Sequence, residues 1–284
     1  MFATINGARM YFDVEGSGYV ANGPGMRKKE ALFLLHGGPG SDHSDFKPWL
    51  SPLAEHVQLI YVDHRGNGQS ERTDFSTYTI EQMADDLDGL RQYLGLDRVS
   101  VLGHSFGGMV AQVYASKYQQ HLCKLVLVCT APSVGFWEDA QRFAEKIAKP
   151  EQLAVLPQLF QGKITNEAEL EKWWELCLSL YFYKHDEQLM HEVGARPIGS
   201  LEVSNYMFEH EMPKYDIRHA LPGIQTETLI IAARHDWVTP VSQAEVIHQL
   251  LPAGKLVVFE QSGHMPFIEE QNDFNELLRQ FLLS

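Results

Sequence analysis

The chain is poor in cysteine, with only Cys123, Cys129 and Cys177 among its 284 residues. Three cysteines do not make a disulfide framework, so we expect reduced thiols and a cytoplasmic protein. No stretch of about 18 uninterrupted apolar residues occurs, and residues 1–16 lack a basic segment followed by an apolar one, so we expect neither a membrane span nor a signal peptide. Basic residues are also scarce, 23 against 37 acidic ones, which gives a formal net charge of −14. A surface of this sign repels phosphates, so neither a nucleic acid nor a membrane is an expected partner.

Hydrophobic residues, in contrast, make up 44% of the chain, which is enough for a large core. Short runs rich in Val, Ile and Leu predict the buried strands of a mostly parallel sheet at residues 31–35, 57–62, 99–102, 125–129, 228–232 and 256–259. Residues 3–5 and 10–14 flank Asn6-Gly7 and predict a hairpin that makes one sheet edge antiparallel. Helical patterns at residues 80–94, 107–118 and 273–283 alternate with the strands. This order predicts a doubly wound α/β fold.

Residues 133–221 break the alternation, because no strand pattern occurs there and helical patterns follow one another at residues 137–148, 151–160, 167–183, 187–193 and 201–209. We predict a helical cap at 133–221, inserted into a core domain formed by residues 1–132 and 222–284. Its aromatic side chains, Trp174 and Tyr206 among them, are candidates to line a substrate pocket, although such rings also pack helices together. Residues 19–30 are interpreted as a polar connecting loop.

The strongest functional signal is the segment Gly103-His104-Ser105-Phe106-Gly107, which lies between a predicted strand and a predicted helix. Strand, sharp turn and helix in this order are typical of a nucleophile elbow, which exposes the serine at the top of the sheet. Glycines flank the serine because the turn crowds the backbone against side chains. The sequence therefore predicts Ser105 as a nucleophile.

A serine hydroxyl needs a base, and the base needs a carboxylate that fixes its tautomer. Asp236 follows the predicted strand at 228–232, and His264 follows the strand at 256–259, so both are expected at the same sheet edge as Ser105. The chain order serine, aspartate, histidine is that of α/β-hydrolases. His235 is the alternative base. Acyl transfer also needs oxyanion donors, for which we assign the backbone N–H groups of Gly38, after the strand at 31–35, and Phe106.

No metal-binding pattern is complete, since His191-Glu192 begins an H-E-x-x-H motif whose last position holds Ala195. A serine, a histidine and a carboxylate with an oxyanion hole suffice for acyl transfer, so we expect neither a metal nor an organic cofactor. The expected partner is a small-molecule or short peptide substrate. The sequence does not determine the oligomeric state.

The chain resembles the α/β-hydrolase superfamily and, within it, the proline iminopeptidase family of serine peptidases. The resemblance rests on five motifs in the family's order, HGGPG at 36–40, DHRGNGQS at 63–70, the segment around Ser105, DWVTP at 236–240 and SGH at 262–264. It implies an α/β-hydrolase fold, an acyl-enzyme on Ser105, and proton transfer by His264.

The sequence also departs from that family. The segment around Ser105 reads GHSFGG, a form common among esterases, where the peptidases often carry GGSWGS or GGSWGT. The peptidases bind the substrate's amino end with acidic residues, one of which commonly follows the catalytic aspartate, and here that position holds Trp237. Glu209 is one of the acidic residues left in the predicted cap. Trp237, Glu209, Trp174 and Tyr206 are thus the predicted substrate-binding residues. Three functions follow: an aminopeptidase, a carboxylesterase or lactonase, and an inactive hydrolase fold that serves as a small-molecule receptor.

Overall fold

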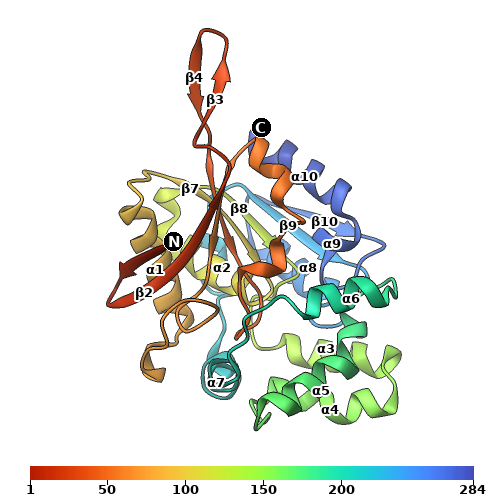
Figure 1. Cartoon of the computed structure of the whole chain (residues 1–284). Helices are drawn as coiled ribbons and strands as arrows, with labels where there is room; N and C mark the ends of the chain where they lie inside the picture. Colours follow the sequence, from red (N-terminus) through yellow and green to blue (C-terminus); the bar gives the residue numbers. More distant parts are fainter.

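The computed structural model describes residues 1–284 and contains one large, mostly parallel sheet (Figure 1). Its eight strands lie in the order β1-β2-β6-β5-β7-β8-β9-β10. They are β1 (Phe2–Ile5), β2 (Ala8–Glu15), β5 (Ala31–Leu35), β6 (Gln58–Val62), β7 (Val99–His104), β8 (Leu122–Val128), β9 (Thr228–Ala233) and β10 (Gly254–Phe259). The predicted α/β fold is confirmed. The central strands β5, β7 and β9 are buried along their whole length and β8 at every residue except Cys123, which explains their largely apolar sequence.

The antiparallel edge consists of β1 and β2, and β2 pairs antiparallel with β6. Asn6 and Gly7 turn the chain between β1 and β2 with positive φ angles of 46° and 78°. The dipeptide adopts this conformation readily because glycine has no Cβ and asparagine tolerates the left-handed region.

A second hairpin was not foreseen. The segment interpreted as a connecting loop contains β3 (Tyr19–Asn22) and β4 (Gly25–Lys28), which pair with each other only. Figure 1 shows this hairpin projecting from the end of the molecule opposite the helices α3, α4 and α5. Its strands are largely exposed, so they carry no buried apolar pattern that would reveal them.

The helices of the core lie in two groups beside the sheet. Helix α1 (Ile80–Tyr93) packs on α2 (Phe106–Tyr118), while α8 (Val241–Leu250) covers β9 and β10. The last helices, α9 (Pro266–Glu269) and α10 (Gln271–Leu283), pack on each other, and α10 contacts the single-turn helix η2 (Ser51–Glu55). Thr79 caps α1 by accepting a hydrogen bond from the N–H of Gln82 at 3.0 Å, as its sequence predicts.

All regular elements between β8 and β9 are helical (Figure 1). They are α3 (Phe136–Ile147), α4 (Pro150–Phe160), α5 (Glu167–Cys177), η5 (Leu178–Tyr181), α6 (Glu187–Gly194), α7 (Leu201–Tyr206), η6 (Met207–Glu211), η7 (Met212–Lys214) and η8 (Leu221–Gly223). An isolated antiparallel bridge pairs Ser133 with Asp216, so the chain enters and leaves this helical segment at one place. The segment's buried apolar side chains belong to the same hydrophobic cluster as the sheet.

None of the helices combines the length and the apolar character that crossing a bilayer requires. The candidate catalytic residues lie in loops at the carboxyl ends of four strands: Gly38 after β5, Ser105 after β7, Asp236 after β9 and His264 after β10. These four strands run parallel to one another, and only β8 lies among them in the sheet. Their carboxyl ends therefore meet at one edge.

Candidate active site

Ser105 occupies the turn between β7 and α2 with φ 53° and ψ −119°, a conformation that non-glycine residues rarely adopt. The glycines on either side make this turn possible. A Cβ on Gly103 would overlap the backbone carbonyl of Gly107, and a Cβ on Gly107 would overlap the carbonyl oxygen of Leu35 on the neighbouring strand. The turn is therefore held against β5 at van der Waals contact, and strain of this kind is commonly found at functional sites.

Asp236 and His264 lie side by side after β9 and β10, and His264 Nδ1 is 2.9 Å from Asp236 Oδ2. A carboxylate can only accept, so the Nδ1 atom carries the proton and donates. Asp236 is fully buried. Its Oδ1 also accepts hydrogen bonds from the N–H groups of Val238 and Thr239, at 2.8 and 3.0 Å, and its Oδ2 accepts one from the Thr239 hydroxyl at 2.7 Å.

These contacts determine the charge of Asp236. Burial raises the pKa of its carboxyl, but the positive charge that His264 gains on protonation and the hydrogen bonds from His264 and Thr239 outweigh burial, so the pKa lies below its usual value. The group is a carboxylate that fixes the His264 ring with Nε2 free to accept a proton.

The backbone of His264 is held from two sides. Its N–H donates to the carbonyl of Tyr181 at 2.7 Å, and its carbonyl accepts from His104 Nε2 at 2.9 Å. Burial lowers the pKa of His104 to about 3, so His104 is neutral and its single ring proton is the donor. The helical segment thus helps to position His264 through the main-chain carbonyl of Tyr181. Every residue has such a carbonyl, so no sequence pattern predicts this contact.

Ser105 and His264 both line the same cavity, beside the loop at residues 37–41. No hydrogen bond joins the Ser105 hydroxyl to the His264 ring in this structure. Such bonds are often long or poorly aligned before substrate binds, and tighten in the complex. The alternative base, His235, instead stacks on Tyr183, with 3.9 Å between ring centroids.

The two predicted oxyanion donors, Gly38 and Phe106, both lie beside Ser105. Phe106 begins α2, and the first N–H groups of a helix have no partner within the helix. Gly38 has φ 115° and lines the cavity with Ser105, and both also line a small pocket of about 20 Å³ beside Phe106. A Cβ on Gly38 would crowd the N–H of Gly40 at 2.9 Å, so only glycine fits this loop comfortably.

The cavity has a volume of about 990 Å³ and lies between the sheet edge and helices α4, α5 and α6. Of the predicted substrate-binding residues, Trp174 lines it. Trp237, Tyr206 and Glu209 are not among its lining residues. Trp237 is buried edge-on against Phe160 and Tyr181, Tyr206 stacks on Phe75, and Glu209 lies 3.7 Å from His210 at the surface.

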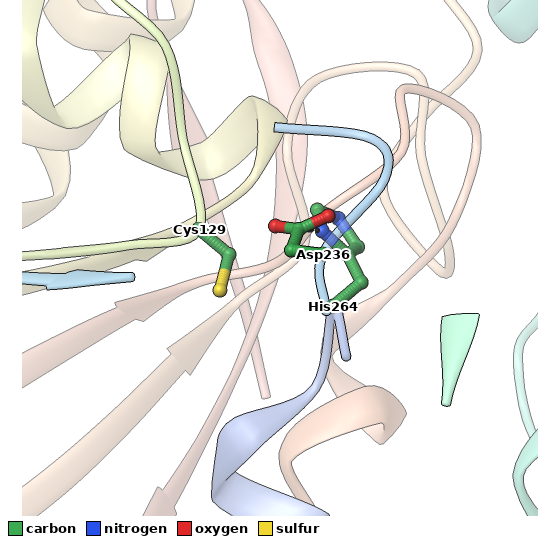
Figure 2. A group of neighbouring side chains, drawn as sticks. All are labelled: Cys129, Asp236 and His264. Carbon is green, nitrogen blue, oxygen red and sulfur yellow. Dashed lines mark hydrogen bonds and ion pairs between the residues drawn. The ribbon is translucent and has the colours of Figure 1, made fainter. Parts of the chain in front are cut away.

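Cys129 is a neighbour of the site that the sequence reasoning did not foresee (Figure 2). Its sulfur, an oxygen of Asp236 and a nitrogen of His264 all lie within 4.8 Å of one another, an N/O/S set that could in principle hold a metal ion. Burial, followed by the charge of Asp236, raises the pKa of the Cys129 thiol well above its usual value. A protonated thiol is a poor metal ligand, and Asp236 and His264 already bond to each other, so the geometry fits a proton-transfer pair better than a metal centre.

Comparisons with known proteins agree with the α/β fold. Residues 30–271 match the family model described as alpha/beta hydrolase fold. The chain is 29% identical over 278 residues to "Proline iminopeptidase PfmaB" of Pestalotiopsis fici, covering 95% of both chains, and 30% identical to a proline iminopeptidase of Lactobacillus delbrueckii subsp. bulgaricus, covering 89% of this chain and 90% of that one.

Solved structures share the fold of this chain. The esterase EaEST from Exiguobacterium antarcticum superimposes with a TM-score of 0.76 at 26% identity, over 100% of this chain and 99% of that chain. An alpha/beta fold family hydrolase from Bacillus anthracis gives a TM-score of 0.81 at 23% identity, over 99% and 98%. The family match over most of the length, together with the serine at the strand-to-helix turn, leads to one conclusion: the chain belongs to the α/β-hydrolase fold family.

Proposed function

We propose that this protein is a serine hydrolase in which Ser105 attacks a carbonyl carbon, His264 accepts the serine proton, and Asp236 orients His264. The observation that carries the proposal is the position of Ser105, at a strained strand-to-helix turn that lines the same cavity as the His264–Asp236 pair. One other buried histidine pairs with a carboxylate, His43 with Asp63 at 2.7 Å, but neither of these residues lines the cavity.

The reaction proceeds in two halves. The Ser105 oxygen bonds to the carbonyl carbon while its proton moves to His264 Nε2, and the N–H groups of Gly38 and Phe106 stabilise the negative oxygen. The intermediate then breaks its bond to the amine or alcohol, which leaves with the proton from His264. Water attacks the acyl-enzyme in the same way and releases the acid. Removing one oxyanion donor typically costs about 3 to 4 kcal/mol of transition-state stabilisation.

For the substrate, we propose a small amide, cleaved as by a proline iminopeptidase. The similarity to proteins named proline iminopeptidase over about 90% of the chain supports this choice. Trp174 and other apolar side chains of the helical segment, which we propose acts as a cap, would contact the substrate's apolar part. Cleavage of an ester or lactone is the second candidate. The GHSFGG segment, Trp237 after Asp236, and the similarity to an esterase at 26% identity favour it.

The experiment compares proline 4-nitroanilide with 4-nitrophenyl acetate and butyrate as substrates of the purified protein. Release of nitroaniline, lost in the Ser105→Ala variant, supports the aminopeptidase. Hydrolysis of the esters without any release of nitroaniline would reject the peptidase and support the esterase. If the folded protein turns over neither class and does not react with a fluorophosphonate, the serine hydrolase is rejected and an inactive small-molecule receptor becomes the candidate.

A further inference from the structure

A carboxyl group that the proposed mechanism does not use lies inside the active-site cavity. Asp45 belongs to the single-turn helix η1 (His43–Phe46), which follows the loop that contains Gly38. Its side chain lines the cavity together with residues 37–41, and the residue is only 8% exposed. Asp45 therefore belongs to the wall of the site rather than to the outer surface.

The neighbouring aspartates show how unusual Asp45 is. Asp42 accepts hydrogen bonds from the N–H and hydroxyl of Ser44 and from the N–H of Ile198. Asp63 accepts from the N–H and the ring of His43 and from the N–H of Gln69.

Asp45 has a single hydrogen bond, from the Ser41 hydroxyl to Oδ2 at 3.2 Å, and its other oxygen has none. This second oxygen is not among the fully buried unpartnered atoms of the protein, so it can be reached from the cavity that Asp45 lines. A carboxyl group that is itself almost buried and keeps one accessible oxygen without a protein partner can accept a hydrogen bond from a donor in the cavity.

The charges around Asp45 indicate the kind of donor. Burial raises the pKa of its carboxyl to about 7, with further contributions from the charges of Asp42 and Asp63, while the Ser41 hydrogen bond and the charge of His43 lower it. Its one hydrogen bond comes from Ser41, so no lysine or arginine pairs with it. The cavity as a whole carries six carboxylates against one lysine, Lys149. The carboxylates are those of Asp45, Glu151, Glu167, Glu171, Glu175 and Glu187. Five of them are exposed glutamates that give the cavity a negative potential, and Asp45 is the one buried beside the loop of Gly38.

We propose that Asp45 is a substrate-binding residue that pairs with a positively charged amine of the substrate, so that the cavity selects amine-bearing substrates over neutral ones of the same shape. The proposal rests on the proposed function, because it takes this cavity as the substrate site. Asp45 is a residue that holds the substrate and takes no part in bond breaking. The ammonium group would donate to the open oxygen, and the Ser41 hydroxyl would keep its bond to the other.

The test uses n-hexylammonium and 1-hexanol, two ligands of equal length that differ in charge. Their dissociation constants are measured by NMR titration of the wild-type protein, Asp45→Asn and Glu187→Gln at about pH 8, where the free Asp45 carboxyl is ionised. Inhibition of 4-nitrophenyl butyrate hydrolysis by each ligand links binding to the active site. Circular dichroism checks folding. If Asp45→Asn does not fold, Asp45→Ser, which also removes the charge, replaces it.

We expect the wild-type protein to bind the ammonium ion about tenfold more tightly than the alcohol, or better, as is usual for a hydrogen bond between charged groups. Asp45→Asn should lose this preference, while Glu187→Gln should change it less than about threefold, because an exposed charge is screened. Equal binding of the two ligands by the wild type would overturn the proposal. So would a preference that survives Asp45→Asn, or one that Glu187→Gln reduces as strongly.

The two proposals can fail separately. If butyrate ester and proline anilide are both left intact, the proposed function fails, while the titration still decides the role of Asp45. If ester turnover depends on Ser105 but the ammonium preference is absent, only the role of Asp45 is rejected.

Discussion

Replacing Asp236 with asparagine tests how the buried carboxylate controls His264. The carboxylate accepts four hydrogen bonds, two at each oxygen. An asparagine side chain has one oxygen and one NH₂ group, so one of the two positions must become a donor. The Oδ1 position faces the backbone N–H groups of Val238 and Thr239, which cannot move away and would clash with an NH₂ group. The amide oxygen of asparagine therefore takes this position.

The NH₂ group then faces His264 Nδ1 and the Thr239 hydroxyl. To accept from it, His264 must carry its proton on Nε2, and that tautomer cannot take a proton from Ser105. A comparable substitution in a serine protease lowers kcat about 10⁴-fold, which corresponds to about 5 kcal/mol. We expect a loss of this size in Asp236→Asn, with the fold retained because the two side chains have nearly the same shape.

The assay is kcat for whichever substrate the wild-type protein hydrolyses, with circular dichroism and thermal unfolding as folding controls. Glu260→Gln is the matched control. Glu260 also follows a strand of the same sheet edge, but its carboxylate is exposed and pairs with Arg234, so kcat should stay within about twofold and stability should hardly change. A folded Asp236→Asn variant that keeps more than a tenth of the wild-type kcat would refute this reasoning.

Three other predictions concern stability. Gly107→Ala should destabilise the fold by at least about 2 kcal/mol or prevent folding, since its Cβ would overlap the carbonyl of Leu35, whereas Gly223→Ala has open space and should be nearly neutral in urea unfolding. Ser105→Gly should be at least as stable as Ser105→Ala in the same assay, because glycine relieves the positive φ; a clearly less stable glycine variant would argue against strain at the turn. Asp45→Asn should raise the thermal unfolding temperature at pH 8 and have little effect near pH 4. The pKa of Asp45 is about 7 in the folded protein and about 3.8 when unfolded, so ionisation above pH 4 disfavours the folded state. The destabilisation has a ceiling of about 4 kcal/mol, which is reached above pH 7. An equal effect of Asp45→Asn at both pH values would contradict the raised pKa.

Much of the core fold follows from local sequence patterns. The strands at the centre of the sheet are buried on both faces, so each reads as a short apolar run, and β5 is found at the predicted residues 31–35. The pattern fails where burial is weak. The hairpin of β3 and β4 is exposed and was interpreted as a loop, and the helix predicted over residues 167–183 ends as α5 at Cys177, followed by the tighter turn η5.

Some residues of the candidate site could be predicted from the sequence and others could not. The positions of Ser105, Asp236 and His264 follow from motifs placed directly after strands, and the structure brings Asp236 and His264 into contact. The main-chain carbonyl of Tyr181, which holds His264, and the thiol of Cys129 beside Asp236 could not be predicted, because both depend on how the helical segment and β8 pack in three dimensions. Trp237 shows that a residue next to a catalytic candidate in the sequence need not line the site, since it follows Asp236 but packs into the core.

The account depends most directly on Ser105 being a nucleophile activated by its surroundings. The decisive measurement is the intact mass of the folded protein after reaction with a fluorophosphonate, followed by peptide mapping, for the wild type and Ser105→Ala. We predict one adduct for each wild-type chain, on the peptide that contains Ser105, and none on the variant. An unlabelled wild-type protein, or an adduct that persists in Ser105→Ala, would contradict the account.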